Sequence, residues 1–170
     1  PSTLTLYLDQ AGSVGSGLNY NSPSIFSFYR GGGDEALLSK LGVGAAFLFC
    51  VLLLAALWVG RQGKNDRVLL CAFTLTAICV PLLLPHMHDR YFFGADVLSF
   101  ALAFLGVELL PPPFLCSFAS LLGYHAYLKM RYLLPMRTGA AALLFAALLI
   151  LFEIYFLASE KNMKKRKNGA

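Results

Sequence analysis

Charged residues are scarce in this sequence. Only 14% of its 170 residues are Asp, Glu, Lys or Arg, whereas 58% are hydrophobic. A soluble domain usually has about a quarter of its residues charged, so this composition excludes an ordinary soluble domain. The apolar residues also gather in runs of about 15–25, the length that crosses the hydrocarbon core of a bilayer. We therefore predict an integral membrane protein of the all-α class, a multi-span helical bundle.

Patterns typical of metal sites and disulfides are also missing. The sequence has no CxxC motif, and its four cysteines all lie in apolar runs, at Cys50, Cys71, Cys79 and Cys116. Such thiols are expected to be buried and to behave as small hydrophobic side chains. His86 and His88 could bind a metal from an extended segment, but no further Cys/His cluster lies nearby. The sequence therefore predicts no metal site.

The start of the chain lacks a signal-peptide pattern. It begins with Pro1 and continues through a polar Gly/Ser/Asn segment, with no basic region followed by an apolar one. We therefore expect the C-terminal part of a longer protein.

Hydropathy divides the chain into three parts. Residues 1–35 contain no span, and residues 160–170 form a basic tail. Between them, residues 36–159 are predicted to form about five transmembrane helices. Pro111–Pro113 are expected to end the third, because proline lacks an amide hydrogen. The predicted spans are 36–60, 68–84, 96–110, 114–128 and 138–159.

Basic residues predict the orientation of these spans. Three lie in the Arg61–Arg67 loop and five in the tail, and with five spans both segments fall on one side, which we expect to be cytoplasmic. Residues 1–35, the His86–Asp96 stretch and the Lys129–Arg137 connection then lie outside. A basic tail after an apolar span is typical of a cytoplasmic anchor facing anionic lipid, so the lipid bilayer is an expected partner and nucleic acid is not.

The stretch from Pro85 to Asp96 concentrates polar groups at the end of a predicted span. Arg90 offers planar donors suited to a phosphate, Asp89 could orient it, and His86 and His88 could donate to phosphate oxygens or exchange protons. The alternative is an interfacial loop of solvated charges and headgroup-level aromatics. Under either interpretation, Asp96 is expected to be the N-cap of the third span.

Other polar residues near the ends of the predicted spans are expected to have structural roles. Glu153 is expected either to reach the interface or to pair with a basic residue of a helix missing from this sequence, and His125 to be hydrogen-bonded at the outer end of the fourth span. Neither Glu153 nor Glu108 is assigned a catalytic role. The basic residues between the fourth and fifth spans could cover a phosphate or simply extend to the interface, namely Lys129, Arg131 and Arg137.

Two segments resemble motifs of one family. Residues 84–99 resemble the pattern H-x-H-[ED]-R-Y-F-[FY]-x-A-D-x-L-S of bacterial membrane mannosyltransferases, which are related to the enzyme that adds the second mannose of GPI anchors. These enzymes belong to the GT-C class of polytopic glycosyltransferases. Residues 19–26 resemble the family's N-x-P-[NS]-[IL]-[YF] segment. Gly94 departs from the family's frequent proline, and Asp89 from its frequent glutamate.

The resemblance implies a C-terminal part of a GT-C-like helical bundle. It implies an inverting transfer, outside the cytoplasm, of a mannose-like sugar from a polyprenyl-phosphate donor to a glycan or lipid acceptor. The donor phosphate would lie at His86, His88, Asp89 and Arg90. A candidate substrate loop would contain Asn19, Asn21, Ser22 and Pro23.

The same resemblance implies what this segment would lack. The acidic catalytic base would lie in an earlier loop, so the segment alone is expected to be inactive. No organic cofactor is expected, and a divalent metal stays open as a requirement. The expected location is a bacterial cell membrane, with the N-terminal segment outside and the C-terminal tail cytoplasmic. The alternatives are a transporter or flippase component for lipid-linked glycans and a non-catalytic membrane subunit.

Overall fold

The computed structural model describes residues 17–60 and 65–168, with side chains as far as residue 159. Helix dominates this part of the chain, as the all-α prediction requires. Its five α-helices are α2 (Glu35–Val59), α3 (Asp66–Leu83), α4 (Phe93–Ala103), α5 (Pro111–Lys129) and α6 (Met136–Asn168). Short 3-10 helices occur at η1 (Ile25–Phe28), η2 (Asp89–Phe92) and η3 (Val107–Leu109). The pair of two-residue strands, β1 (Asn19–Tyr20) and β2 (Met87–His88), was not predicted.

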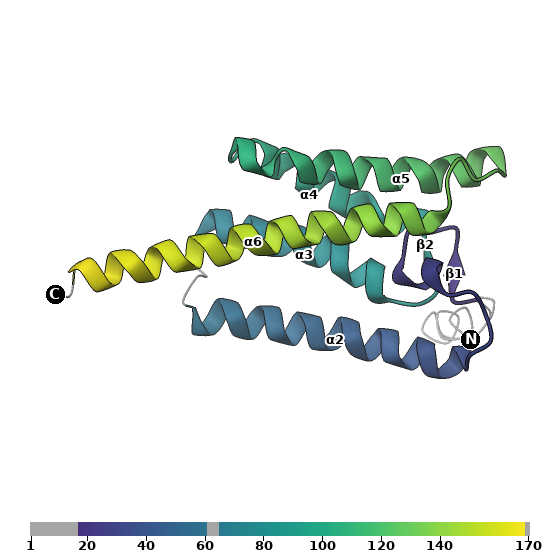
Figure 1. Cartoon of the computed structure of the whole chain (residues 1–170), viewed down its shortest axis with the longest axis horizontal. Helices are drawn as coiled ribbons and strands as arrows, with labels where there is room; N and C mark the ends of the chain where they lie inside the picture. Colours follow the sequence, from purple (N-terminus) through teal and green to yellow (C-terminus); the bar gives the residue numbers. More distant parts are fainter. Residues whose placement is uncertain (1–16, 61–64, 169–170) are drawn as a thin grey trace, which may run out of the picture.

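The helices run roughly along one long axis, and their connections alternate between two ends of the bundle (Figure 1). Helix α6 crosses the middle and packs against α5 and α3, whereas α2 lies at the edge against α3. One end carries β1, β2 and the start of α6. The opposite end carries the end of α2, the start of α3 and the C-terminal end of α6. The structure therefore groups the connections at two ends as predicted, although residues 61–64 of the basic loop lie outside the described part.

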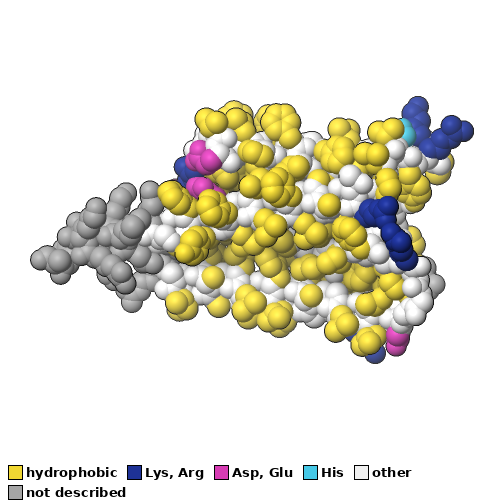
Figure 2. Space-filling model, in the orientation of Figure 1, with side chains coloured by type: hydrophobic (Ala, Val, Ile, Leu, Met, Phe, Trp, Pro, Cys, Tyr) yellow, Lys and Arg dark blue, Asp and Glu magenta, His cyan; other side chains and the backbone are white. Residues whose placement is uncertain are grey.

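Three described helices are long and apolar enough to cross a membrane, at Glu35–Val59, Asp66–Leu83 and Met136–Ser159. Apolar side chains cover the visible face of the bundle over most of its length (Figure 2). On α2, Phe47 is 72% exposed and Trp58 is 86% exposed. An apolar surface of this extent is typical of contact with lipid or with another protein.

The helix predicted over residues 96–110 is shorter than expected. Helix α4 ends at Ala103, and Gly106 separates it from η3. Glycine is a poor helix former, and the Leu105 carbonyl instead accepts a hydrogen bond from Arg67 at 3.3 Å. Eleven residues of α-helix rise only about 16 Å, roughly half the hydrocarbon core, so α4 does not cross it alone.

The predicted start of the fourth span is corrected. Pro111–Pro113 form the first turn of α5, which therefore begins before the predicted residue 114. Proline is tolerated there because the first amides of a helix have no intrahelical partner. Helix α6 continues to Asn168, into the basic tail predicted at 160–170.

The prediction that Asp96 is the N-cap of the third span is wrong. Helix α4 begins at Phe93, so Asp96 is its fourth residue and not its N-cap. A carboxylate in the first turn still interacts favourably with the helix dipole. The side chains that do cap helices are Asp34, which accepts from two amides of α2, and Asn65, which accepts from two amides of α3.

The core lies between α3, α4, α5 and α6. Its large, fully buried side chains include Leu75, Ile78, Phe92, Leu102 and Leu143. All four thiols are free, and the predicted burial is confirmed for Cys71, Cys79 and Cys116, whereas Cys50 is half-buried.

A cluster of charges lies at the end of the bundle opposite β1 and β2. The Nη2 atom of Arg67 contacts Oε1 of Glu153 at 2.7 Å and also Oε1 of Glu108. The partner of Glu153 is therefore Arg67, on α3 of the described chain, and the expected partner on a helix outside this sequence is not needed. Because Glu153 is only 8% exposed, it does not reach the interface as the other expectation required. Arg67 connects α3 with η3 and α6.

Candidate functional site

The strands β1 and β2 pair in parallel, with Asn19 opposite Met87 and Tyr20 opposite His88. The amide of His86 extends this pairing by donating to the carbonyl of Leu18 at 2.9 Å. The pairing brings together the two segments that resembled family motifs, although almost seventy residues separate them in sequence. These segments therefore form one site at one end of the bundle.

His86 holds the two segments together. Its Nδ1 lies 2.7 Å from the carbonyl oxygen of Gly17, and its Nε2 lies 3.5 Å from Oγ of Ser39. Its φ of 59° is in the left-handed region, which is uncommon for a residue other than glycine. Because the backbone and both ring nitrogens have neighbours, His86 is better placed to fix the loop than to bind a phosphate.

The ring of His88 lies between two tyrosines. It stacks on Tyr20 with ring centroids 5.1 Å apart and an interplanar angle of 21°, and it lies 6.2 Å from the ring of Tyr91. Within the described ranges, no hydrogen bond is made by its ring nitrogens. The stacking fixes the plane of the ring, and the nitrogens stay available to hydrogen-bond a ligand.

Arg90 is exposed on η2, with its guanidinium carbon 5.7 Å from the centre of the Tyr91 ring. It forms no ion pair with any acidic side chain of residues 17–60 or 65–159. A planar guanidinium without an acidic partner is well suited to an anion such as a phosphate. Of the four residues predicted for the donor phosphate, His88 and Arg90 are therefore the best placed, and Asp89 packs against α5.

The predicted substrate loop is held by its own side chains. Oδ1 of Asn19 accepts from the amide of Ser22 at 3.1 Å and from its hydroxyl at 2.7 Å, and Nδ2 donates to the Ser22 carbonyl at 2.9 Å. Ser22 and Pro23 are buried, with Pro23 against Gly139 of α6. These three residues therefore shape the loop. Asn21 is exposed and accepts a hydrogen bond from the hydroxyl of Tyr132.

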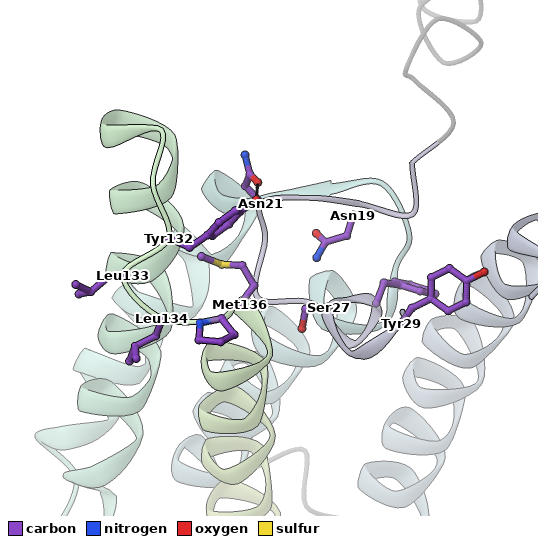
Figure 3. A pocket seen from close by; sticks show the side chains of 10 residues that line it. Asn19, Asn21, Ser27, Tyr29, Tyr132, Leu133, Leu134 and Met136 are labelled. Carbon is purple, nitrogen blue, oxygen red and sulfur yellow. Dashed lines mark hydrogen bonds between the residues drawn. The ribbon is translucent and has the colours of Figure 1, made fainter. Parts of the chain in front are cut away.

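A cavity of about 600 Å³ lies between this loop and the connection from α5 to α6 (Figure 3). We call it the loop pocket. In Figure 3, Tyr132 reaches toward Asn21 from the opposite wall. Its lining residues are Asn19, Asn21, Phe26, Ser27, Tyr29, Tyr132, Leu133, Leu134, Pro135 and Met136. The sequence predicted Asn19 and Asn21 as part of a substrate loop. It did not predict the second wall of the pocket, residues 132–136, for which the only signal was Tyr132 among basic residues.

The C-terminal end of α5, which precedes the second wall of the pocket, confirms the prediction for His125. Nδ1 of His125 lies 3.0 Å from the carbonyl oxygen of Arg131, beyond a left-handed Met130 that ends α5. His125 is therefore a hydrogen-bonded structural residue, as expected. The basic side chains Lys129, Arg131 and Arg137 are exposed, and basic groups gather at this end of the molecule (Figure 2).

Gly123 sets the distance between α5 and η2. A Cβ atom at this position would lie 2.8 Å from Cβ of Asp89, closer than such atoms approach in proteins. We expect Gly123→Ala to lower the free energy of unfolding by about 1–2 kcal/mol, the cost of overpacking, and to displace η2 with Arg90. Thermal or chemical unfolding in detergent measures this loss.

Gly44 is the matched control for that substitution. It lies on α2 and a Cβ atom there would meet nothing within 4 Å. Gly44→Ala should leave the stability unchanged or raise it, because alanine is the better helix former. Equal behaviour of the two variants would contradict the close packing of α5 on η2.

Asp96 is a further polar group that sequence reasoning treated only as a cap. Its Oδ1 is buried and accepts no hydrogen bond from any side chain or amide in the described part of the chain. In the same part, no three His, Cys, Asp or Glu side chains are grouped so that they could hold a metal ion.

Comparison of the chain with known proteins found no matching family model, no matching curated sequence and no matching solved structure.

Proposed function

We propose that this protein is a membrane glycosyltransferase of the GT-C type. It transfers a mannose-like sugar from a polyprenyl-phosphate donor to a glycan or lipid acceptor on the extracytoplasmic face. The observation that carries the proposal is the parallel pairing of β1 with β2, because it joins two segments whose sequences independently resemble one transferase family.

The apolar exterior supports a location in a membrane. Helix α2 exposes large apolar side chains around most of its surface, and only 11% of its most apolar 18-residue stretch is buried. A helix that is apolar all round is stable when lipid covers it. In a bacterial cell membrane we place the C-terminal end of α6 in the cytoplasm and the β1–β2 end outside, because the Arg61–Arg67 loop and the tail carry eight basic residues. The outer end would carry five, at Arg30, Arg90, Lys129, Arg131 and Arg137, and an anionic ligand there would account for them.

The chemistry of the site suits a departing phosphate. A phosphate-linked sugar donor already carries its leaving group, so the enzyme must stabilise the charge that develops on that phosphate and deprotonate an acceptor hydroxyl. Arg90 provides a fixed positive charge for the first task, and His88 provides a donor held by stacking on Tyr20. The base for the second task is proposed to lie in an earlier segment of the protein.

Sugar transfer in vesicles tests the proposal against its alternatives. The full-length protein is reconstituted with a radiolabelled polyprenyl-phosphate mannose and a membrane extract as the source of acceptor. We expect label to pass from the donor to a new product that no longer extracts as the donor. Movement of intact donor between leaflets without a new product would favour a flippase component. Absence of both activities would favour a non-catalytic subunit.

A further inference from the structure

The connection between α5 and α6 carries three basic side chains, which we call the basic corner. Lys129 is the last residue of α5, Arg131 follows it in the connection, and Arg137 is the second residue of α6. All three side chains are exposed, and basic side chains project from this part of the molecule in Figure 2. The corner therefore presents three positive charges at the β1–β2 end of the bundle.

No acidic side chain of the described chain compensates these charges. The sequence has no Asp or Glu between Glu108 and Glu153, and both of these pair with an arginine at the opposite end of the bundle. Asp89 packs against α5, but it does so at Gly123, almost two helical turns before Lys129. Within residues 17–60 and 65–159, the basic corner forms no ion pair. Its partner is therefore expected to be an anion from outside the chain.

Hydrogen bonds hold the backbone of the basic corner in place. Nδ1 of His125 lies 3.0 Å from the carbonyl oxygen of Arg131, within α5 and the connection. The hydroxyl of Tyr132 donates to Oδ1 of Asn21, in the loop that follows β1. The charges are thus presented by an ordered turn, and such ordering in advance reduces the entropy that is lost when a ligand binds.

Exposed apolar side chains lie among the basic ones. Tyr127, Leu128, Met130 and Leu133 are interspersed with them along the chain, and each is exposed. A soluble anion has no group to place against these side chains, whereas a phospholipid brings a charged headgroup and acyl chains together. Segments that mix basic, aromatic and aliphatic side chains are typical of the membrane interface. The anion that fits the corner is therefore a lipid headgroup.

The proposed orientation favours such a headgroup over simple extension of the basic side chains into water. Basic residues are disfavoured on the outer side of a membrane, yet three of the five at this end belong to the basic corner. An anionic bilayer surface strengthens binding by about 5-fold for each Lys or Arg close to it. An anionic lipid therefore accounts for charges that the orientation alone leaves without a reason.

We infer that the basic corner binds the headgroup of an anionic phospholipid of the surrounding bilayer, such as phosphatidylglycerol. Arg131 and Arg137 each offer a planar fork of donors to the phosphate, and Lys129 adds a third positive charge. The neighbouring apolar side chains contact the acyl chains. The inference does not depend on sugar transfer, since Arg90, which is proposed to hold the donor phosphate, lies on η2 and is not part of the corner.

Local quenching by brominated lipids tests the inference. Trp58 is the only tryptophan of this chain and lies at the opposite end of the bundle, so Trp58→Phe/Tyr127→Trp moves the single tryptophan to the basic corner. This variant is reconstituted in phosphatidylcholine bilayers with a small fraction of dibrominated phosphatidylglycerol or of dibrominated phosphatidylcholine. We expect the quenching to show phosphatidylglycerol enriched about 5-fold or more at the corner. Equal quenching by the two lipids would overturn the inference.

Substitution of the three basic residues should remove this preference. In the same background, Lys129→Gln/Arg131→Gln/Arg137→Gln should be quenched equally by the two lipids, and its helix content should not change, because all three side chains are exposed. The matched control is Arg30→Gln/Lys40→Gln, which removes two exposed basic residues from the same end of the bundle and should keep the preference. A preference that survives in the triple variant, or that is lost equally in the control, would refute a site at the corner.

Two further measurements separate this site from other sources of phosphate. Inorganic phosphate, compared with chloride at equal ionic strength, should not reduce quenching by phosphatidylglycerol, because it brings no acyl chains. Arg90→Gln should leave the preference unchanged. Loss of the preference under either condition would overturn the inference, by assigning the corner to a soluble anion or to the donor site. A preference that persists in a protein without sugar transfer supports the inference and counts against the proposed function alone.

Discussion

Replacing Arg90 by alanine is expected to lower sugar transfer by about 100- to 1,000-fold, the usual cost of removing one charged or hydrogen-bonding group that stabilises the transition state. Charge develops on the phosphate as the bond to the sugar breaks, and Arg90 is an exposed guanidinium with no acidic partner in the described chain. The loss should appear in kcat more than in the KM for the donor, because the interaction strengthens as the leaving group departs. Initial rates with labelled donor measure it.

Two control variants distinguish a chemical role of Arg90 from a structural one. Because its side chain is exposed and forms no ion pair within residues 17–60 and 65–159, Arg90→Ala should leave the thermal unfolding temperature unchanged. Arg90→Lys keeps the charge without the planar fork and should retain an intermediate rate. Arg30→Ala removes an exposed charge at the same end of the bundle and should transfer sugar normally. Normal turnover by Arg90→Ala would refute the transferase assignment.

The ends of the bundle could be predicted from sequence, but the pairing of β1 with β2 could not. Alternation of apolar runs with polar connections places residues 17–34 and 84–92 at the same end, as Figure 1 shows. Each strand is only two residues long, which is too short for an alternating pattern of side chains. The register depends instead on His86, whose ring and backbone both bond to the loop before β1. Such long-range bonds leave no local signal.

Hydropathy does not predict the length of a helix where the sequence remains apolar beyond the end of that helix. Residues 96–110 are almost continuously apolar, yet α4 ends at Ala103, since the chain turns at Gly106 and Arg67 bonds to the Leu105 carbonyl. A proline run marks a helix boundary equally ambiguously, because proline can follow the end of one helix or lie in the first turn of the next. The partner of Glu153 was missed for a related reason. Arg67 was counted with the basic loop, but it is the second residue of α3 and faces the bundle.

That inward-facing arginine gives the largest expected effect on stability. Arg67→Met should lower the free energy of unfolding by about 3 kcal/mol, the lower end of the range for a broken buried ion pair, because its side chain is 29% exposed. The substitution leaves the carboxylate of Glu153, with only 10% of its side chain exposed, without a counter-charge between α3 and α6. Denaturant titration in detergent, followed by circular dichroism, measures the loss.

Comparison of the two glutamates shows where the stabilisation resides. The Glu108 side chain is 53% exposed, and hydrogen bonds from its own backbone amide and from Arg67 lower its pKa. Exposed pairs contribute little, so Glu108→Gln should change the stability far less than Arg67→Met. The double variant Arg67→Met/Glu153→Leu should recover most of the loss, because an apolar pair can replace a buried ion pair without a large cost. If Glu108→Gln is as damaging as Arg67→Met, the arginine stabilises the end of the bundle mainly through η3. If instead the double variant recovers nothing, the loss in Arg67→Met does not come from an unpaired Glu153, and the hydrogen bond to Leu105 is the interaction that matters.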